Sequence, residues 1–341
     1  MRIVAGAMAS NAPITAAVVG GGVMGAFHVR ALLDRPDVEA VVLVEPSEER
    51  RALLERRHGR LRSYPSLDAA LERERLDCAC VAVPPALAPE LASALIEREV
   101  PVLLEKPMAP TVAEAEPVVA LAEERGVLLS VGYIERFNPA VEALRGELAN
   151  GVAGRVLHMH ARRLSPLPTR DGLANLVKDS TTHDLDVMCH LLGGAPQRAY
   201  AEMGANLVCA SVRWEDDVTG LVETNWLTPM KIRRLTVTAE GGMFEVDYLT
   251  QDLFFHEQPR SEPHWETLGV VRGANEGRMI RYALDRREPL AVEWERFIAA
   301  LRDGGPAPVP GREGLNALAL AEAIIASART ATPVAPEGLS V

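Results

Sequence analysis

Residues 14–25 read ITAAVVGGGVMG, an apolar run rich in β-branched side chains that ends in a cluster of glycines. Apolar residues at helical spacing follow at once over residues 26–33. A strand, a glycine turn and a helix in this order are typical of a dinucleotide-binding fingerprint. Gly20 would form the tight turn, Gly22 would let the backbone approach a pyrophosphate, and Gly25 would let helix and strand pack closely.

A second marker of the same site lies further along the chain. The next apolar run, residues 38–44, ends at Glu45, about 20 residues beyond Gly25. A carboxylate at this position binds the free ribose diol and repels a 2′-phosphate, which favours NAD over NADP. Arg50 and Arg51 lie one helical turn later and could soften that preference.

Composition narrows the function classes. The 341 residues have a formal net charge of −11, and 48% of them are hydrophobic, as in an ordinary globular protein. An acidic chain is a poor partner for nucleic acid or an anionic membrane, and no apolar run is long enough to span a bilayer. Residues 1–13 are interpreted as a frayed leader, with Met8 as an alternative start. The four cysteines show no zinc-type spacing, so a cytoplasmic location is expected.

The first part of the chain alternates strand-like and helix-like segments, which predicts a parallel sheet covered by helices on both faces. The expected strands are 14–19, 38–44, 77–83, 100–104 and 127–132, and the expected helices include 48–58, 67–74, 89–99 and 112–125. We therefore expect an α/β Rossmann domain, a doubly wound parallel sheet, over residues 1–133.

The pattern changes from about residue 154, where extended stretches follow one another with polar turns. They are 156–163, 198–214, 220–227, 234–239, 242–248 and 253–257, with helices at 180–192, 293–302 and 314–329. This pattern predicts an α+β domain with a large, mostly antiparallel open sheet over residues 134–341, used for substrate binding and oligomerisation. Its C-terminal helix is expected to be able to pack back on the first domain.

Two sets of residues suggest acid–base chemistry. Lys106 ends the strand 100–104 and could stabilise a substrate oxyanion, or be a surface lysine in a turn. Asp179 and His183 are four residues apart at the start of a helix, where a carboxylate could orient a histidine general base. The alternatives are an N-cap for Asp179 and a partly buried structural role for His183.

A metal site is another alternative, because His183, Asp186 and His190 share one helix face, but hydride transfer to a nicotinamide needs no metal and none is expected. Candidate substrate contacts come from two segments. Arg163 and Arg170 flank a proline-stiffened segment and could clamp a phosphate or carboxylate, or be solvated loop arginines. The others are Tyr133 and Asn138, for which turn and packing roles are equally open.

Six segments support a family resemblance when they are taken in order. They are GGGVMG at 20–25, VAVPPALAPELA at 81–92, VPVLLEKPMAPT at 100–111, VGYIERFNP at 131–139, DSTTHDLDVMCHLLGG at 179–194 and GLNALALAEAIIASARTATPV at 314–334. In these segments the chain resembles the glucose–fructose oxidoreductase/inositol dehydrogenase (Gfo/Idh/MocA) family. The resemblance implies a catalytic, cofactor-contacting Lys106, an acid/base pair of Asp179 and His183, and a cis peptide before Pro107.

The resemblance also completes the expected cofactor site. The predicted cofactor-binding residues are Gly20, Gly22, Val23, Met24, Gly25, Glu45, Val83, Pro84, Glu105 and Lys106. One turn departs from the family, because residues 83–88 read VPPALA where relatives usually carry T-P-N-H-x-H. Any contact that those polar side chains make in relatives is therefore in doubt here.

Within the family, R-x-x-P-x-P-x-R at 163–170, D-x-x-x-H-D-x-D at 179–186 and GGMFEVDYLTQDL at 241–253 most resemble UDP-N-acetylglucosamine 3-dehydrogenase-like enzymes. The resemblance implies NAD-dependent oxidation of a secondary ring hydroxyl, at C3 of a UDP-linked amino sugar, to a ketone, or the reverse. The alternatives are a cyclitol, inositol or free-sugar dehydrogenase and a non-catalytic dinucleotide-sensing regulator. A homodimer or homotetramer is expected, because the second sheet would otherwise leave apolar residues wet.

Overall fold

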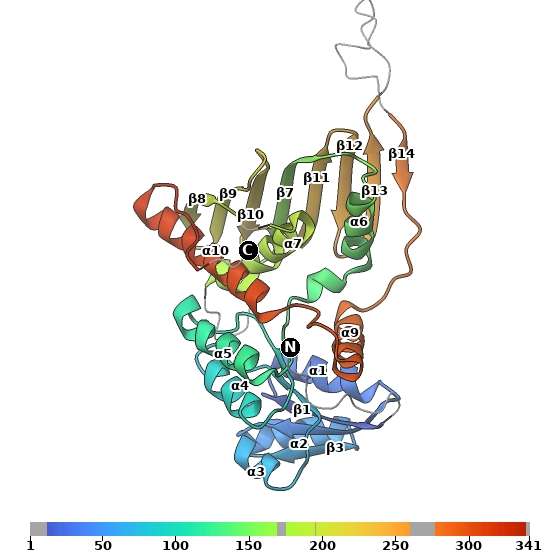
Figure 1. Ribbon diagram of the computed structural model, residues 1–341, viewed down its shortest axis with the longest axis vertical. Coiled ribbons are helices and arrows are strands. Elements are labelled where there is room, and N and C mark those ends of the chain that lie inside the picture. Colours follow the sequence, from blue (N-terminus) through green and yellow to red (C-terminus); the bar gives the residue numbers. More distant parts are fainter. Residues whose placement is uncertain (1–11, 169–174, 195, 260–276, 339–341) are drawn as a thin grey trace, which may run out of the picture. The chain divides into compact units, whose positions relative to one another are not determined.

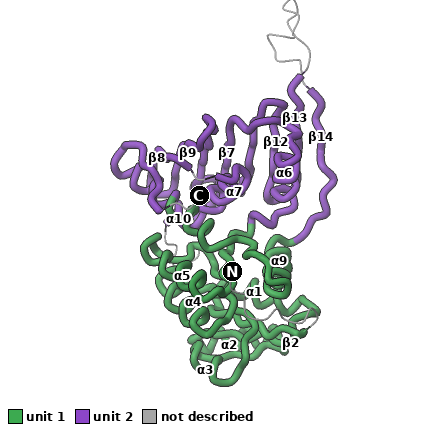
Figure 2. The backbone as a smooth tube through the Cα atoms, in the orientation of Figure 1, with its two compact units in different colours: residues 1–134, 288–319, 340 green, residues 135–287, 320–339, 341 purple. Residues whose placement is uncertain are grey.

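The computed structural model describes residues 12–168, 175–194, 196–259 and 277–338, which form two compact units (Figure 2). Among these residues, unit 1 comprises 12–134 and 288–319, and unit 2 comprises 135–287 and 320–338. Residues 288–319 thus lie in unit 1, although the change in sequence pattern assigns everything after residue 133 to the second domain.

Unit 1 contains a six-stranded sheet, of which Figure 1 labels the strands β1 and β3. The strand order is β3-β2-β1-β4-β5-β6, and every neighbouring pair is parallel. The strands are β1 Ile14–Val19, β2 Val38–Val44, β3 Leu61–Tyr64, β4 Cys78–Val81, β5 Val102–Leu104 and β6 Leu129–Val131. The order reverses between β1 and β4, where a doubly wound sheet opens a crevice for its ligand. The expected doubly wound sheet is confirmed, with β3 as an additional strand.

Local capping explains where several helices of unit 1 begin and end. The helices are α1 Val23–Leu33, α2 Glu48–Arg57, α3 Leu67–Leu71, α4 Ala88–Ile96, α5 Val112–Arg125, α9 Pro289–Asp303 and the first part of α10 Gly311–Thr330. The hydroxyls of Ser47, Ser66 and Thr111 accept backbone N–H groups at the starts of α2, α3 and α5. The helix α5 stops at Gly126, whose φ of 64° suits glycine.

Helix α9 returns to unit 1 because one of its faces is apolar. Leu290, Trp294 and Phe297 are buried in the same cluster as Ile14 of β1 and Leu32 of α1. Burying a side chain of this size stabilises a fold by about 1.5–3 kcal/mol. Since these contacts join segments more than 250 residues apart, no local sequence pattern specifies them.

Unit 2 is built on an eight-stranded sheet in the order β14-β13-β12-β11-β7-β10-β9-β8. The strands are β7 Val156–Leu164, β8 Arg198–Gly204, β9 Leu207–Arg213, β10 Thr219–Asn225, β11 Ile232–Ala239, β12 Gly242–Asp247, β13 Asp252–Glu257 and β14 Met279–Arg281. Only β7 and β10 pair in parallel among these strands, so the expected mostly antiparallel sheet is confirmed. The expected strand 198–214 is a hairpin of two strands.

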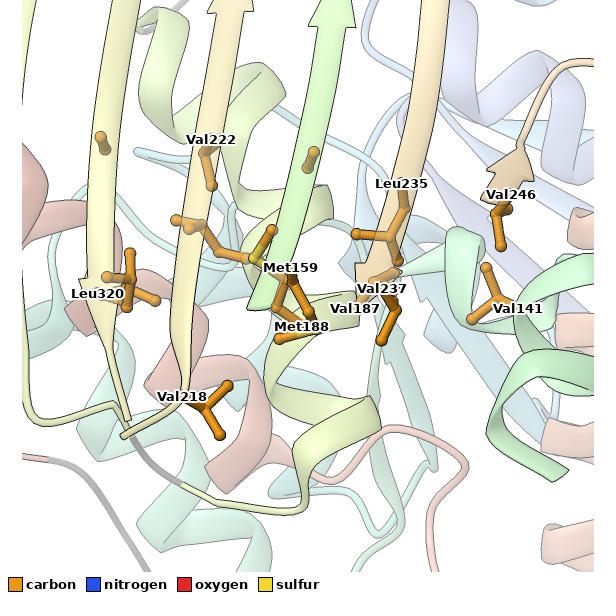
Figure 3. Packing of buried hydrophobic residues seen from close by; sticks show 14 of the residues in the cluster. Val141, Met159, Val187, Met188, Val218, Val222, Leu235, Val237, Val246 and Leu320 are labelled. Atoms are coloured by element: carbon orange, nitrogen blue, oxygen red, sulfur yellow. The ribbon is translucent and has the colours of Figure 1, made fainter. Parts of the chain in front are cut away.

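Helices cover one face of this sheet. They are α6 Pro139–Ala149, α7 Thr182–Leu192 and the end of α10, preceded by the 3₁₀ turn η1 Ile134–Phe137 and the π-helical turn η2 Val177–Thr181. Figure 3 shows Met159, Val222 and Leu235 of the sheet near Val187 and Met188 of α7, and all five belong to one buried cluster. The helix α6 and the strand β14 were not predicted.

The described part of the chain contains no helix that is both long and apolar enough to cross a membrane. Its longest helix, α10, has 20 residues, and four of them are charged: Arg312, Glu313, Glu322 and Arg329.

Candidate active site

The glycine turn after β1 has the geometry that its sequence predicts. Gly20 adopts a φ of +104°, and a Cβ there would lie 2.3 Å from the carbonyl oxygen of Ala82. A Cβ on Gly25 would lie 1.8 Å from the carbonyl oxygen of Gly20, so only glycine lets α1 approach β1 this closely. Around Gly22 a Cβ would meet nothing within 4 Å, which leaves its backbone open to a phosphate.

Glu45 lies directly after β2, beside the glycine turn, and is buried. Its Oε2 accepts the Gly21 N–H at 2.8 Å, and its Oε1 accepts the Ser47 N–H at 2.9 Å. Each carboxylate oxygen retains a further lone pair for a ribose hydroxyl. The guanidinium of Arg50, which is largely exposed, lies 3.8 Å from Oε1.

The other predicted cofactor residues of unit 1 lie at the carboxyl ends of neighbouring strands. Val23 and Met24 begin α1, where first-turn N–H groups have no acceptor within the helix. Val83 packs against the glycine turn, since its Cγ1 would be 3.0 Å from a Cβ on Gly20, and Pro84 is exposed in the same loop. The arrangement therefore fits a dinucleotide.

Glu105 and Lys106 follow β5, and the Lys106–Pro107 peptide is cis, as the family resemblance implies. Lys106 is half-buried, whereas Glu105 is buried and turned into unit 1. Glu105 Oε1 lies 2.9 Å from Nε2 of His28, and its Oε2 accepts the Lys106 N–H at 3.1 Å. The carboxylate of Glu105 is thus engaged inside the protein, and no sequence pattern predicts its partner, His28.

Asp179 and His183 lie on either side of a helix transition. Asp179 is in the π-helical turn η2, and His183 is in the first turn of α7. π-Helical turns occur preferentially at functional sites. Both side chains are partly exposed, whereas Asp184 and Asp186, which also belong to the motif, are buried.

Asp184 is held by Arg163, which is one of the two predicted substrate clamps. Arg163 is 4% exposed and donates from Nε and Nη2 to the two Asp184 oxygens, at 2.6 and 3.2 Å. It also donates to Glu135 at 3.1 Å, and Glu135 lies 3.5 Å from Arg233. Burial raises the pKa of Asp184, although the Arg163 guanidinium opposes that shift. Arg163 therefore pairs with two buried carboxylates of unit 2, which is a structural role.

Asp186 is held in the same way by Arg136, whose Nε donates to its Oδ2 at 2.7 Å. Arg136 also lies 3.2 Å from Nδ1 of His190, and burial together with this cation lowers the pKa of His190 to about 3. Two members of the alternative metal set, Asp186 and His190, therefore contact a guanidinium. Across the described residues, no group of three His, Cys, Asp or Glu side chains could hold a metal ion.

The remaining candidate substrate residues are Asn138, Tyr133 and Arg170. Asn138 caps α6 by accepting the Ala140 N–H at 3.1 Å, and its amide donates to the carbonyl of Tyr248 at 3.1 Å. Its turn role is therefore the one that the structure supports. Tyr133 is 2% exposed in unit 1, and Arg170 lies outside the described residues.

Comparisons with known proteins place both parts of the chain in the same oxidoreductase family. Residues 14–133 match a model described as an oxidoreductase family with an NAD-binding Rossmann fold, and residues 141–245 match the GFO/IDH/MocA C-terminal domain. A UDP-N-acetylglucosamine 3-dehydrogenase of Acidithiobacillus ferrooxidans is 26% identical over 89% of this chain and 94% of its own.

A second relative, the myo-inositol dehydrogenase Hyg17 of Streptomyces leeuwenhoekii, is 30% identical over 85% of this chain and 94% of its own. The solved structure of a levoglucosan dehydrogenase in complex with NADH and levoglucosan superposes with a TM-score of 0.83. That comparison covers 95% of this chain and 100% of the other at 19% identity, which supports the fold.

Proposed function

Because the chain belongs to the Gfo/Idh/MocA oxidoreductase family and is a sugar or polyol dehydrogenase, we propose that it oxidises C3 of a UDP-linked amino sugar to a ketone, or catalyses the reverse. The observation that carries the proposal is the combination of a fitting dinucleotide turn with D-x-x-x-H, which spans η2 and the first turn of α7, in a chain that is similar over most of its length to a UDP-N-acetylglucosamine 3-dehydrogenase.

Three side chains carry the chemistry in this proposal. His183 takes the hydroxyl proton, Asp179 orients its imidazole, and Lys106 donates to the oxygen on which negative charge develops. A bound nicotinamide supplies the hydride acceptor. These roles require Lys106 and His183 to act on the same substrate oxygen, which is a prediction.

NAD is the proposed cofactor. The family model is NAD-binding, and the buried carboxylate of Glu45 beside the glycine turn favours a ribose diol over a 2′-phosphate. Arg50 lies close enough to Glu45 to moderate this preference.

The substrate class has a specific alternative, because the chain is also similar to a myo-inositol dehydrogenase. Arg163 is committed to Asp184 and Glu135, so binding of a substrate diphosphate would depend on Arg170 or another cation. A cyclitol or free sugar needs no such cation.

Screening UDP-N-acetylglucosamine, myo-inositol and free sugars with NAD and with NADP, by NADH absorbance, tests the proposal. We expect the highest kcat/KM with the nucleotide sugar and NAD. A preference for inositol would support the alternative substrate. Absence of turnover, together with a biological output that survives His183→Ala, would support a non-catalytic sensor.

We also propose that the protein forms a homodimer or homotetramer through the face of the unit 2 sheet opposite α6 and α7. Tyr200 of β8 and Leu221 of β10 are 36% and 40% exposed. A monomer in sedimentation velocity experiments would contradict this proposal, and Leu221→Arg should reduce the sedimentation coefficient.

A further inference from the structure

A buried chain of hydrogen bonds connects α9 to the residue that precedes Lys106. The Trp294 indole N–H donates to Nδ1 of His28 at 3.0 Å, and Nε2 of His28 lies 2.9 Å from Glu105 Oε1. The other Glu105 oxygen accepts the backbone N–H of Lys106 at 3.1 Å. Trp294 and His28 are both 0% exposed, and all four residues belong to unit 1.

The positions of the protons in this chain follow from the donors. An indole N–H can only donate, so Nδ1 of His28 must be the acceptor and carry no proton. The proton of a neutral imidazole then lies on Nε2, which donates to Glu105. A carboxylate between two donors, the imidazole and the Lys106 amide, has a fixed orientation.

The surroundings of Glu105 restrict it further. A Cβ on Gly132 would lie 3.1 Å from Cδ and from Oε2 of Glu105, so the backbone closes one side of the carboxylate. Burial and the charge of Glu105 raise the pKa of Glu293, and burial raises the pKa of Cys80. Hydrogen bonds in such a poorly solvated region are strong and hold their geometry.

We infer that Trp294 and His28 are positioning residues, which fix the Glu105 carboxylate and, through the Lys106 amide, the placement of the Lys106 side chain. The inference rests on the proposed function only for the catalytic role of Lys106. A catalytic group displaced by a fraction of an ångström loses much of its effect.

The spectroscopic test exploits the fact that the chain has only three lysines, Lys106, Lys178 and Lys231. Protein labelled with ¹⁵N-lysine gives three backbone amide signals, and the Lys106 signal is identified by its absence in Lys106→Arg. Trp294→Phe keeps an aromatic ring and removes the N–H. We expect it to change the chemical shift of the Lys106 amide and to leave those of Lys178 and Lys231 unchanged. His28→Leu should move it further, and His28→Gln, whose amide can still donate to Glu105, should return it toward the wild-type position.

The matched control is Ile298→Ala, which removes a fully packed side chain from the same helix and leaves the hydrogen-bond chain intact. A Lys106 signal that moves as much in Ile298→Ala as in Trp294→Phe would overturn the inference, as would equal shifts in His28→Gln and His28→Leu. None of these signals depends on a substrate, so they decide the inference even if no sugar is oxidised.

Turnover supplies the second readout once a sugar substrate is known. Trp294→Phe should lower kcat by about tenfold, with the Kd of NAD and the KM of the sugar within about threefold of wild type. Ile298→Ala should keep the wild-type kcat at a temperature where it is folded. Equal kcat in wild type and Trp294→Phe, despite a moved Lys106 signal, would show that the chain does not serve catalysis.

Discussion

Arg163→Met is expected to destabilise unit 2 rather than to weaken the binding of an anionic substrate. The variant keeps an unbranched side chain in place of the aliphatic part of Arg163 and removes its guanidinium, which donates to both Asp184 oxygens in a residue that is 4% exposed. Glu135 keeps a cation, because Arg233 lies 3.5 Å from it. Asp184 loses the hydrogen bonds from Arg163 to both of its oxygens and keeps the coulombic attraction of Arg233, so this buried carboxylate is poorly compensated.

The size of the effect follows from that loss. Removing one partner of a buried ion pair costs about 3–5 kcal/mol. For a unit of this size, the thermal midpoint should fall by roughly 6–20 °C. The pKa of Asp184 is already raised by burial and should rise further without Arg163. Stability is then lost as the pH rises through that pKa, so the penalty should be smaller at about pH 5 than at about pH 8.

Differential scanning calorimetry of four proteins tests this reasoning. Arg162→Met is the control, because Arg162 is 43% exposed and pairs with Glu223 at 3.2 Å, so its loss should cost under about 1 kcal/mol. The double variant Arg163→Met/Asp184→Leu should recover most of the stability, since an apolar pair replaces the ion pair. If Arg163→Met unfolds like Arg162→Met but raises the KM of a nucleotide sugar, Arg163 is a substrate clamp after all.

Three further predictions concern the proposed chemistry and the buried acid of α9. Lys106→Ala and His183→Ala should each lower turnover by orders of magnitude while the Kd of NAD changes by less than about threefold. The control is Lys231→Ala, at an exposed lysine. Full activity in Lys106→Ala and His183→Ala would show that these two residues are not catalytic. Glu45→Gln should raise the NADP-to-NAD ratio of kcat/KM by about tenfold, because it removes the charge that repels a 2′-phosphate; the exposed Glu48→Gln is its control, and an unchanged ratio in Glu45→Gln would show that another group reads the ribose. Burial raises the pKa of Glu293, so the folded state binds more protons than the unfolded chain, and wild-type stability should fall as the pH rises above the ordinary range of glutamate. The melting temperature of Glu293→Gln should therefore exceed that of wild type by a margin that grows between about pH 5 and about pH 8. A margin that does not change with pH would show that folding does not raise the pKa of Glu293.

Much of unit 1 is predictable from the sequence because its decisive interactions are local. The glycine turn, the apolar β1 and the start of α1 lie within a dozen residues, and the space around Gly20 and Gly25 permits no other residue. The helix 112–125 was predicted with its observed bounds, since Thr111 caps its start and Gly126 ends it. The alternation of apolar and polar residues likewise predicts the mostly antiparallel sheet of unit 2.

Two of the elements that were not predicted differ in their local signals: β3 has a weak pattern, whereas α6 has a clear start signal. The strand β3 has four residues, of which only Leu61 is buried, so it carries little periodicity. The helix α6 begins at Pro139 directly after a capping Asn138, a residue that was predicted to be a substrate contact. The capping signal could have identified it.

The sequence alone determined the residue types at each candidate position, the turn that only glycine can make, and the class of each sheet, because these depend on neighbours within a few residues. The tertiary structure decided which charged side chains are buried and paired with one another inside the protein. Arg163 meets Asp184 and Glu135, 21 and 28 positions away, and Glu105 meets His28 and, through it, Trp294. Desolvation of a charge depends on everything that packs around it, so burial and pairing emerge only when the chain has folded.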